Sequence, residues 1–227
     1  MIVGAGICGS EAALACAAKG LDTLLVTTSL DTVYNLLGDG VKLEPREGTV
    51  MKAAFDKLAE SGFLGNWDMH RYAKQVIETV PEIHFLQSNV SGLIVQDRRV
   101  IGVHTWEGVA RYAKKVALTV GSFLRPRLTI GTLTEAAGRL SEMAYDDLYD
   151  NLLSLGFDFE PIELEAAFED DSLPYSIDCQ VFADHEKEGF RLTRLNDLYA
   201  AGVCAFGAIS YEDAALQGRD LAGELSS

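Results

Sequence analysis

Three glycines near the start of the chain have the spacing of a dinucleotide-binding loop. Gly4, Gly6 and Gly9 follow the apolar pair Ile2-Val3. In this G-x-G-x-x-G pattern the first glycine permits a tight turn, the second lets a diphosphate approach the backbone, and the third lets a helix pack on the strand. The N–H groups and the dipole at the start of that helix favour an anion. The alternative is an ordinary glycine-rich turn. A second apolar strand over 22–27 favours the nucleotide site.

The residue after this second strand departs from the usual NAD pattern. A dinucleotide site usually holds an acidic residue there, about 20 residues beyond the glycines, to bind the ribose. This chain has Thr28, between Thr27 and Ser29, and the nearest acidic residue is Asp31. A hydroxyl group can still bind a ribose oxygen. An NAD-dependent Rossmann dehydrogenase therefore remains as an alternative that Thr28 disfavours.

Further elements must build the sheet that positions this loop. Apolar runs at 116–120 and 198–201 end at Gly121 and Gly202, as is typical of buried parallel strands. Hydrophobic spacing predicts helices over 10–19, 49–61, 67–79 and 211–224, and short strands over 83–86, 90–95 and 100–106. We interpret residues 30–47 as a loop. The least regular region is predicted to contain a helix over 141–155 and a partial strand over 157–168.

These elements predict an α/β fold. We expect a Rossmann-like arrangement with a parallel central sheet flanked by helices, and a small antiparallel β element near residues 83–106. A single domain over 1–227 is predicted, in which 1–124 and 195–227 form the nucleotide site and 125–194 form an inserted cap. The first strand is short, so we expect that a few native N-terminal residues are missing.

The negative charge of the chain is concentrated in one segment. The net charge is −15, and residues 142–188 contain 15 acidic residues and one basic residue, Lys187. This segment is either a solvated surface or a docking face for a basic protein partner. Binding of nucleic acid by the protein alone is disfavoured, because phosphate contacts need clustered lysine and arginine.

The cysteines indicate a reducing, cytoplasmic environment. Cys8, Cys16, Cys179 and Cys204 form no C-x-x-C pair and no metal-binding pattern with the four histidines. Cys204 is either a redox-active thiol beside a cofactor or a small buried residue. The apolar runs fall short of the roughly 20 residues of a membrane span, so no membrane association is expected.

Three segments resemble the glucose-inhibited division protein A (GidA) family. The first is the glycine loop followed by Glu11-Ala12-Ala13, and the second is residues 112–124. The third contains Ala201-Gly202, Gly207, Tyr211-Glu212, Ala214-Ala215 and Gln217-Gly218. Its Tyr-Glu and Gln-Gly pairs are the most specific, because they are not general to Rossmann folds.

This resemblance implies an FAD-binding, oxidoreductase-like protein that transfers hydride through flavin, with NADH or NADPH as reductant. The family modifies the wobble uridine of transfer RNA with a partner GTPase and folate chemistry. This chain is shorter, without the family's insertion and C-terminal helical domain, and residues 30–47 lack the family's cysteine. We therefore expect FAD binding without direct tRNA binding. A non-catalytic flavin-binding accessory protein is the alternative.

The residues predicted to bind FAD lie in the glycine loop, at the ends of strands, or at the start of the terminal helix. No catalytic residue or metal ligand is predicted, and Arg125 and Arg127 are either phosphate ligands or solvated. The FAD-binding set is Gly4, Gly6, Ile7, Cys8, Gly9, Ser10, Thr27, Thr28, Ser29, Thr119, Gly121, Gly202, Val203, Ser210, Tyr211 and Ala214.

Overall fold

Alternate residues of the central strands face two different layers. In the computed structural model, which describes residues 1–36, 43–60, 65–166 and 174–227, Ile2, Leu25 and Ala117 pack among helices. Their neighbours Val3 and Val26 pack against a second β layer. Because successive side chains of a strand point to opposite faces, these apolar runs are buried on both sides.

The central sheet has seven strands in the order β14-β15-β16-β7-β1-β2-β3. Strands β16, β7, β1, β2 and β3 are parallel, as expected for a Rossmann-like fold, whereas β14 and β15 add an antiparallel edge. Their bounds are β1 Ile2–Val3, β2 Thr23–Thr27, β3 Ile83–Gln87, β7 Val116–Leu118, β14 Lys187–Glu188, β15 Arg191–Leu192 and β16 Leu198–Ala200.

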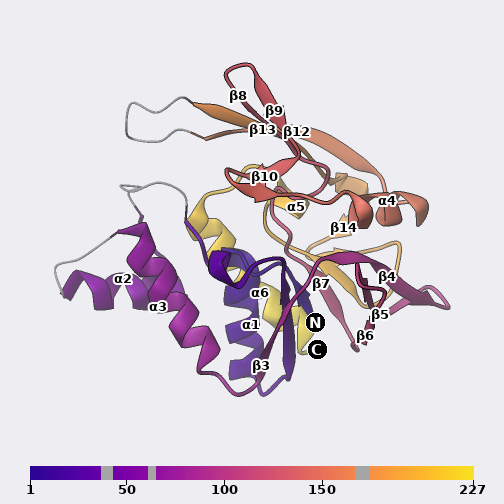
Figure 1. Cartoon of the computed structure of the whole chain (residues 1–227). Coiled ribbons are helices and arrows are strands. Elements are labelled where there is room, and N and C mark those ends of the chain that lie inside the picture. Colours follow the sequence, from indigo (N-terminus) through magenta and orange to yellow (C-terminus); the bar gives the residue numbers. More distant parts are fainter. Residues whose placement is uncertain (37–42, 61–64, 167–173) are drawn as a thin grey trace.

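Helices cover one face of this sheet (Figure 1). Helix α1 (Ile7–Ala18) lies beside α6 (Tyr211–Leu225), and α2 (Val50–Glu60) pairs with α3 (Asn66–Glu78). Helix α1 begins three residues before the predicted 10–19, because Gly6 is its N-cap. Among the described residues, none of the helices combines the length and the apolar character that crossing a membrane requires.

The other face is covered by antiparallel β structure and one helix. Strands β4 (Val90–Gln96), β5 (Arg99–Thr105) and β6 (Ala110–Tyr112) form a three-stranded sheet, against which α4 (Asp147–Ser154) packs. A four-stranded sheet, β12-β13-β8-β9, lies at the top of the view in Figure 1. Its strands are β8 Arg127–Ile130, β9 Leu133–Glu135, β12 Phe159–Ala166 and β13 Tyr175–Phe182.

A short hairpin lies between this upper sheet and the central sheet. It consists of β10 (Ala137–Arg139) and β11 (Glu142–Met143) (Figure 1). The remaining elements are the 3-10 helices η1 (Leu30–Thr32) and η2 (Asp184–Glu186) and the short α5 (Val203–Phe206).

The structure confirms the α/β fold and corrects some boundaries. The strand at residue 83 belongs to the parallel sheet, so the antiparallel element covers 90–112 rather than 83–106. The helix predicted over 141–155 is restricted to α4, because Glu142–Met143 pair with β10 instead. Residues 187–192, inside the predicted cap segment, pair at the edge of the central sheet. Part of the loop predicted over 30–47 lies outside the described residues.

Candidate functional site

The three glycines of the loop meet three different surroundings. Gly4 has φ +106°, and a Cβ there would lie 2.4 Å from the Thr119 carbonyl oxygen. A Cβ on Gly9 would lie 1.8 Å from the Gly4 carbonyl oxygen. Among the described residues, a Cβ on Gly6 would meet no atom within 4 Å. Gly4 and Gly9 are therefore required by the protein's own backbone, whereas the space at Gly6 is open to a ligand.

The start of helix α1 has no side-chain cap. Its N-cap is Gly6, in an extended conformation, and within the described part of the chain no side-chain hydrogen bond caps this turn. The Ser10 hydroxyl donates instead to the Ala5 carbonyl oxygen, at 3.0 Å. Because the first N–H groups of a helix lack partners within it, an anion placed here would receive both hydrogen bonds and a favourable dipole. The open space at Gly6 and this uncapped turn fit the diphosphate of a dinucleotide.

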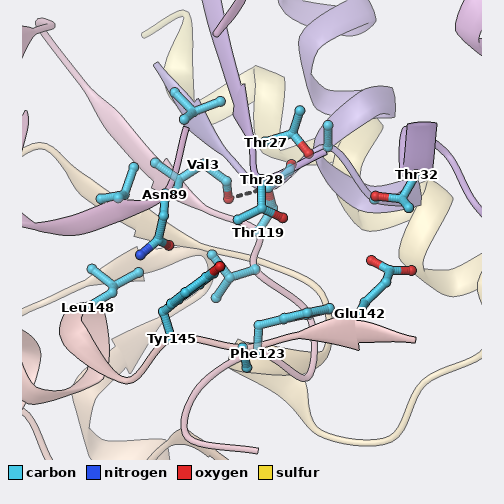
Figure 2. Close-up of a pocket in the computed structure, with 18 of the residues that line it drawn as sticks. Val3, Thr27, Thr28, Thr32, Asn89, Thr119, Phe123, Glu142, Tyr145 and Leu148 are labelled. Carbon is cyan, nitrogen blue, oxygen red and sulfur yellow. Dashed lines mark hydrogen bonds between the residues drawn. The ribbon is translucent and has the colours of Figure 1, made fainter. Parts of the chain in front are cut away.

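A cleft opens at the carboxyl ends of β1, β2 and β7. Figure 2 shows Thr27, Thr28 and Thr119 on one side of it. The Thr119 hydroxyl lies 3.0 Å from the Val3 carbonyl oxygen and 2.9 Å from that of Gly4, so it joins β7 to the glycine loop. Ligands of open α/β sheets bind at this edge, where several strand ends meet.

The opposite wall of the cleft comes from the loop after β7 and from the β10–β11 hairpin. Phe123, Glu142 and Tyr145 lie on this side in Figure 2, while Asn89 and Leu148 lie at one end. The described lining residues are Val3, Gly4, Ala5, Gly6, Val26, Thr27, Thr28, Thr32, Ser88, Asn89, Val90, Thr119, Val120, Gly121, Phe123, Arg139, Glu142, Met143, Ala144, Tyr145 and Leu148.

Six of the predicted cofactor residues line this cleft: Gly4, Gly6, Thr27, Thr28, Thr119 and Gly121. Asn89, Arg139, Glu142 and Tyr145 also line the cleft and were not predicted from the sequence. Asn89 could have been inferred, because it follows the predicted strand 83–86 at the same edge of the sheet. The other three come from the hairpin region, where a helix was predicted in place of β11.

The remaining predicted residues do not line the cleft in the described structure. Ile7, Cys8, Gly9 and Ser10 are buried in the first turn of α1. Ser29 caps η1 by accepting a hydrogen bond from Asp31 N at 3.2 Å. The others lie in the chain from Gly202 to the first turn of α6, and they are Gly202, Val203, Ser210, Tyr211 and Ala214. Their contact with a cofactor stays a prediction.

The segment after β16 is held by hydrogen bonds within the protein. Gly202, at φ +77°, donates its N–H to Gln217 Oε1 at 2.9 Å. The Ser210 hydroxyl caps α6 by accepting from Asp213 N at 3.0 Å. Glu212 Oε1 accepts from the backbone N–H of Glu44, at 2.7 Å. The start of α6 is thus capped, in contrast to that of α1.

Glu11 is a buried carboxylate that links the glycine-loop helix to α2. It is 2% exposed, and its oxygens accept hydrogen bonds from the Tyr34 hydroxyl at 2.5 Å and from Val50 N and Met51 N at 2.9 Å. Burial raises the pKa of Glu11, and these donors oppose that rise. The carboxylate therefore caps α2 and fixes Tyr34.

The thiols lie in surroundings that oppose ionisation. Cys204 is fully buried, and burial raises its pKa to about 12. Since the thiolate is the reactive form, the burial of Cys204 favours a packed small residue over a redox-active thiol. Burial also raises the pKa of Cys179 to about 11.

Several of the charged groups outside the cleft are paired with one another. Asp158, His185 and Glu186 lie close together in the described structure, but Glu186 also pairs with Arg194 and accepts from Asp158 N at 3.0 Å. This group is an ion-pair network. Arg127 pairs with Asp146 at 3.1 Å, and Arg125 lies over the Tyr149 ring, 5.1 Å from its centroid.

Comparison with known proteins identifies relatives over most of the chain. The family described as glucose inhibited division protein A matches residues 1–56 and 65–199. The "tRNA uridine 5-carboxymethylaminomethyl modification enzyme MnmG" of Lactobacillus helveticus (strain DPC 4571) is 32% identical over 183 residues, which cover 69% of this chain and 28% of that protein. The corresponding enzyme of Chlamydia trachomatis serovar A (strain ATCC VR-571B / DSM 19440 / HAR-13) is 31% identical over 183 residues, which cover 69% of this chain and 30% of that protein. The chain thus spans less than a third of these relatives.

Solved structures share the whole fold. The GidA-related protein from Thermus thermophilus is 37% identical, with a TM-score of 0.89, and the match covers 99% of this chain and 96% of that one. GidA of Aquifex aeolicus is 17% identical with a TM-score of 0.84, covering 99% and 62%. The second likeness concerns the fold alone.

Proposed function

Because this chain belongs to the glucose inhibited division protein A family, we propose that its cleft binds FAD and that the protein is a flavin-dependent oxidoreductase. The resemblance to the family is confirmed, with the family match including the glycine loop and residues 112–124, and FAD is the cofactor of this family. The observation that carries the proposal is the uncapped start of α1 facing open space at Gly6, at the edge of the sheet where the cleft opens.

The residues of the cleft divide the recognition of FAD between them. The first N–H groups of α1 would receive the diphosphate, because a helix N-terminus favours an anion. The hydroxyl of Thr28, just after β2, would bind a ribose oxygen, whereas the Thr27 hydroxyl already donates to the Ser29 carbonyl oxygen at 3.0 Å. When bound, the flavin supplies the hydride chemistry. The protein's part is to hold and orient it and to restrict water in the cleft.

A nicotinamide cofactor is proposed as the reductant of the flavin rather than as the resident group. The ribose position holds Thr28 in place of the acidic residue usual for NAD. NADH or NADPH would therefore donate hydride and leave after reduction.

The absorption spectrum of the purified protein tests this proposal. An FAD protein should show the visible bands of oxidised flavin, released by denaturation in equal molar amount to the chain. Anaerobic addition of NADH, and separately of NADPH, should bleach those bands. A protein that neither copurifies with FAD nor binds added FAD would overturn the proposal.

The second candidate is a non-catalytic flavin-binding protein that acts beside a partner. The observation that favours it is the acidic segment 142–188, which suits a basic protein surface. Such a protein would bind FAD and yet show no turnover of NADH or NADPH with added electron acceptors. The same anaerobic titration followed by steady-state oxidation assays separates the two.

A further inference from the structure

The far wall of the cleft carries a fixed pair of opposite charges. Arg139 and Glu142 are cross-strand partners in the β10–β11 hairpin. The Arg139 guanidinium lies 3.0 Å from Glu142 Oε1, with the two side chains 20% and 17% exposed. Both residues line the cleft. An ion pair this shielded is held more firmly than an exposed surface pair.

The hairpin that carries this pair is packed onto the end of β7. The Ser122 hydroxyl donates a hydrogen bond to the Gly138 carbonyl oxygen. A Cβ on Gly138 would lie 2.5 Å from the Phe123 ring, so the absence of a side chain lets the hairpin sit on that ring. Phe123 N in turn donates to the Val120 carbonyl oxygen at 3.1 Å. Arg139 is therefore placed relative to the same strand end that meets the glycine loop.

The guanidinium has donors to spare. Among the described residues that line the cleft, Arg139 is the one lysine or arginine and Glu142 the one aspartate or glutamate. Arginine offers five N–H donors. The structure gives the Arg139 side chain the one hydrogen bond to Glu142 within its described part. The other donors can take a second acceptor while Glu142 keeps the side chain in place.

We propose that Arg139 binds the diphosphate of the bound dinucleotide from the wall opposite the α1 N-terminus, with Glu142 as its positioning residue. This inference rests on the proposed function. The planar guanidinium matches phosphate oxygens in a way that a single N–H cannot, so the anion would be held by the helix start and by Arg139 together. Arg139 would then contribute to cofactor binding, although it belongs neither to the glycine loop nor to the end of a parallel strand.

The test compares nucleotide fragments that differ in the diphosphate. ADP, adenosine and FAD are titrated by calorimetry into the apoprotein, into R139Q and into R127Q. Arg127 is the matched control, since it also pairs with an acidic residue, Asp146, and does not line the cleft. R139Q should bind ADP and FAD about 10- to 100-fold more weakly, as expected for loss of a charged hydrogen-bond donor. Its adenosine affinity should be unchanged, and R127Q should match the unaltered protein for all three.

Each other outcome has a definite meaning. Equal ADP affinity in R139Q and the unaltered protein would overturn this inference and leave the proposed function intact. An equal loss for adenosine and ADP would also overturn it, because Arg139 would then act away from the phosphates. Failure of the unaltered protein to bind FAD or ADP would overturn the proposed function and this inference together. If R139Q does not fold, R139K keeps the charge without the planar fork and should bind ADP several-fold more weakly, with adenosine unchanged.

Discussion

Gly6 is the residue of the loop whose replacement separates ligand binding from folding. A Cβ at this position meets no atom of the described residues within 4 Å, so a larger residue has room beside them in the free protein. We predict that Gly6→Val folds with near-normal stability and loses copurifying FAD, because its side chain fills the space that the diphosphate needs. Flavin content per chain, measured by absorbance after denaturation, checks this.

Gly9→Ala is the contrasting variant. Its Cβ would approach the Gly4 carbonyl oxygen to 1.8 Å, which requires α1 to move away from β1. This variant should lower the free energy of unfolding by about 1–3 kcal/mol, the usual cost of overpacking. Stoichiometric flavin in Gly6→Val would show that the glycine loop is not the phosphate site.

His70 gives the protein a predictable sensitivity to mild acid. It is 3% exposed, its Nδ1 lies 2.6 Å from the Val33 carbonyl oxygen, and its ring stacks on Trp67. Burial lowers the pKa of His70, so the folded protein keeps it neutral where an unfolded chain, with a pKa of about 6.5, takes up a proton. The contribution of neutral His70 to the free energy of unfolding is therefore fully present above about pH 6.5, and it is lost as the pH falls towards the folded-state pKa.

The prediction is that the free energy of unfolding decreases as the pH falls. Urea unfolding between pH 7.5 and 5.5, on the order of one unit either side of the histidine pKa, measures this. His70→Asn should flatten the decline by at most about 1.4 kcal/mol per pH unit, the limit for one proton. His84→Asn, at an exposed histidine on β3, is the control and should leave the slope unchanged. An unaltered slope in His70→Asn would contradict the assignment.

At the scale of elements, the close contact of α1 with α6 sets the position of the glycine loop. A Cβ on Gly218 would lie 2.1 Å from the Cys8 carbonyl oxygen and 2.9 Å from Glu11 Cβ. Helices approach this closely only where one of them lacks a side chain. Gln217, the neighbouring residue, accepts the hydrogen bond from Gly202 N. The Gln-Gly pair therefore joins α6 both to α1 and to the end of β16.

Gly218→Ala should destabilise the protein, because α6 must shift from α1. We predict a loss of about 1–3 kcal/mol in the free energy of unfolding, measured in urea. Gly223→Ala on the same helix is the matched control. A Cβ there meets nothing within 4 Å, so it should stabilise by about 0.5–1 kcal/mol through helix propensity. Equal effects of the two changes would contradict the packing role of Gly218.

At the scale of the whole molecule, the charge distribution opposes binding of a polyanion. Affinity for nucleic acid depends on the number of phosphates that lysine and arginine neutralise. This chain has a net charge of −15, with most of it in residues 142–188. Its relatives named as tRNA-modifying enzymes are more than three times as long as the segment matched here.

We predict that the protein alone binds tRNA with no more than non-specific affinity, a dissociation constant of about 10⁻⁴ to 10⁻⁶ M at physiological salt. A fluorescence anisotropy titration with labelled tRNA measures this. Raising the salt concentration should weaken the residual binding further. A nanomolar dissociation constant for the protein alone would contradict the prediction and place a tRNA site on this chain.

Local patterns determined the parts of the protein that are continuous in sequence. The glycine spacing identified the turn before α1, and apolar runs ending at Gly121 and Gly202 identified the strands β7 and β16. Parallel strands buried on both faces are nearly continuous apolar runs, so they can be recognised in the sequence without knowing which strands lie beside them. The family resemblance likewise depended on short contiguous segments.

Tertiary structure alone decided the far wall of the cleft and the pairing of the small sheets. The helical expectation over 141–155 was wrong at its start because Glu142–Met143 pair with β10, a contact that helix propensity does not contain. Arg139 is a candidate ligand because the hairpin packs on Phe123 and Arg139 lines the cleft, and neither fact can be inferred from the sequence. The burial of Glu11 is likewise decided by tertiary contacts, because the start of α2, 39 residues away, supplies its hydrogen bonds. Such contacts join residues far apart along the chain, and only the packing of sheet, helices and hairpin brings them together.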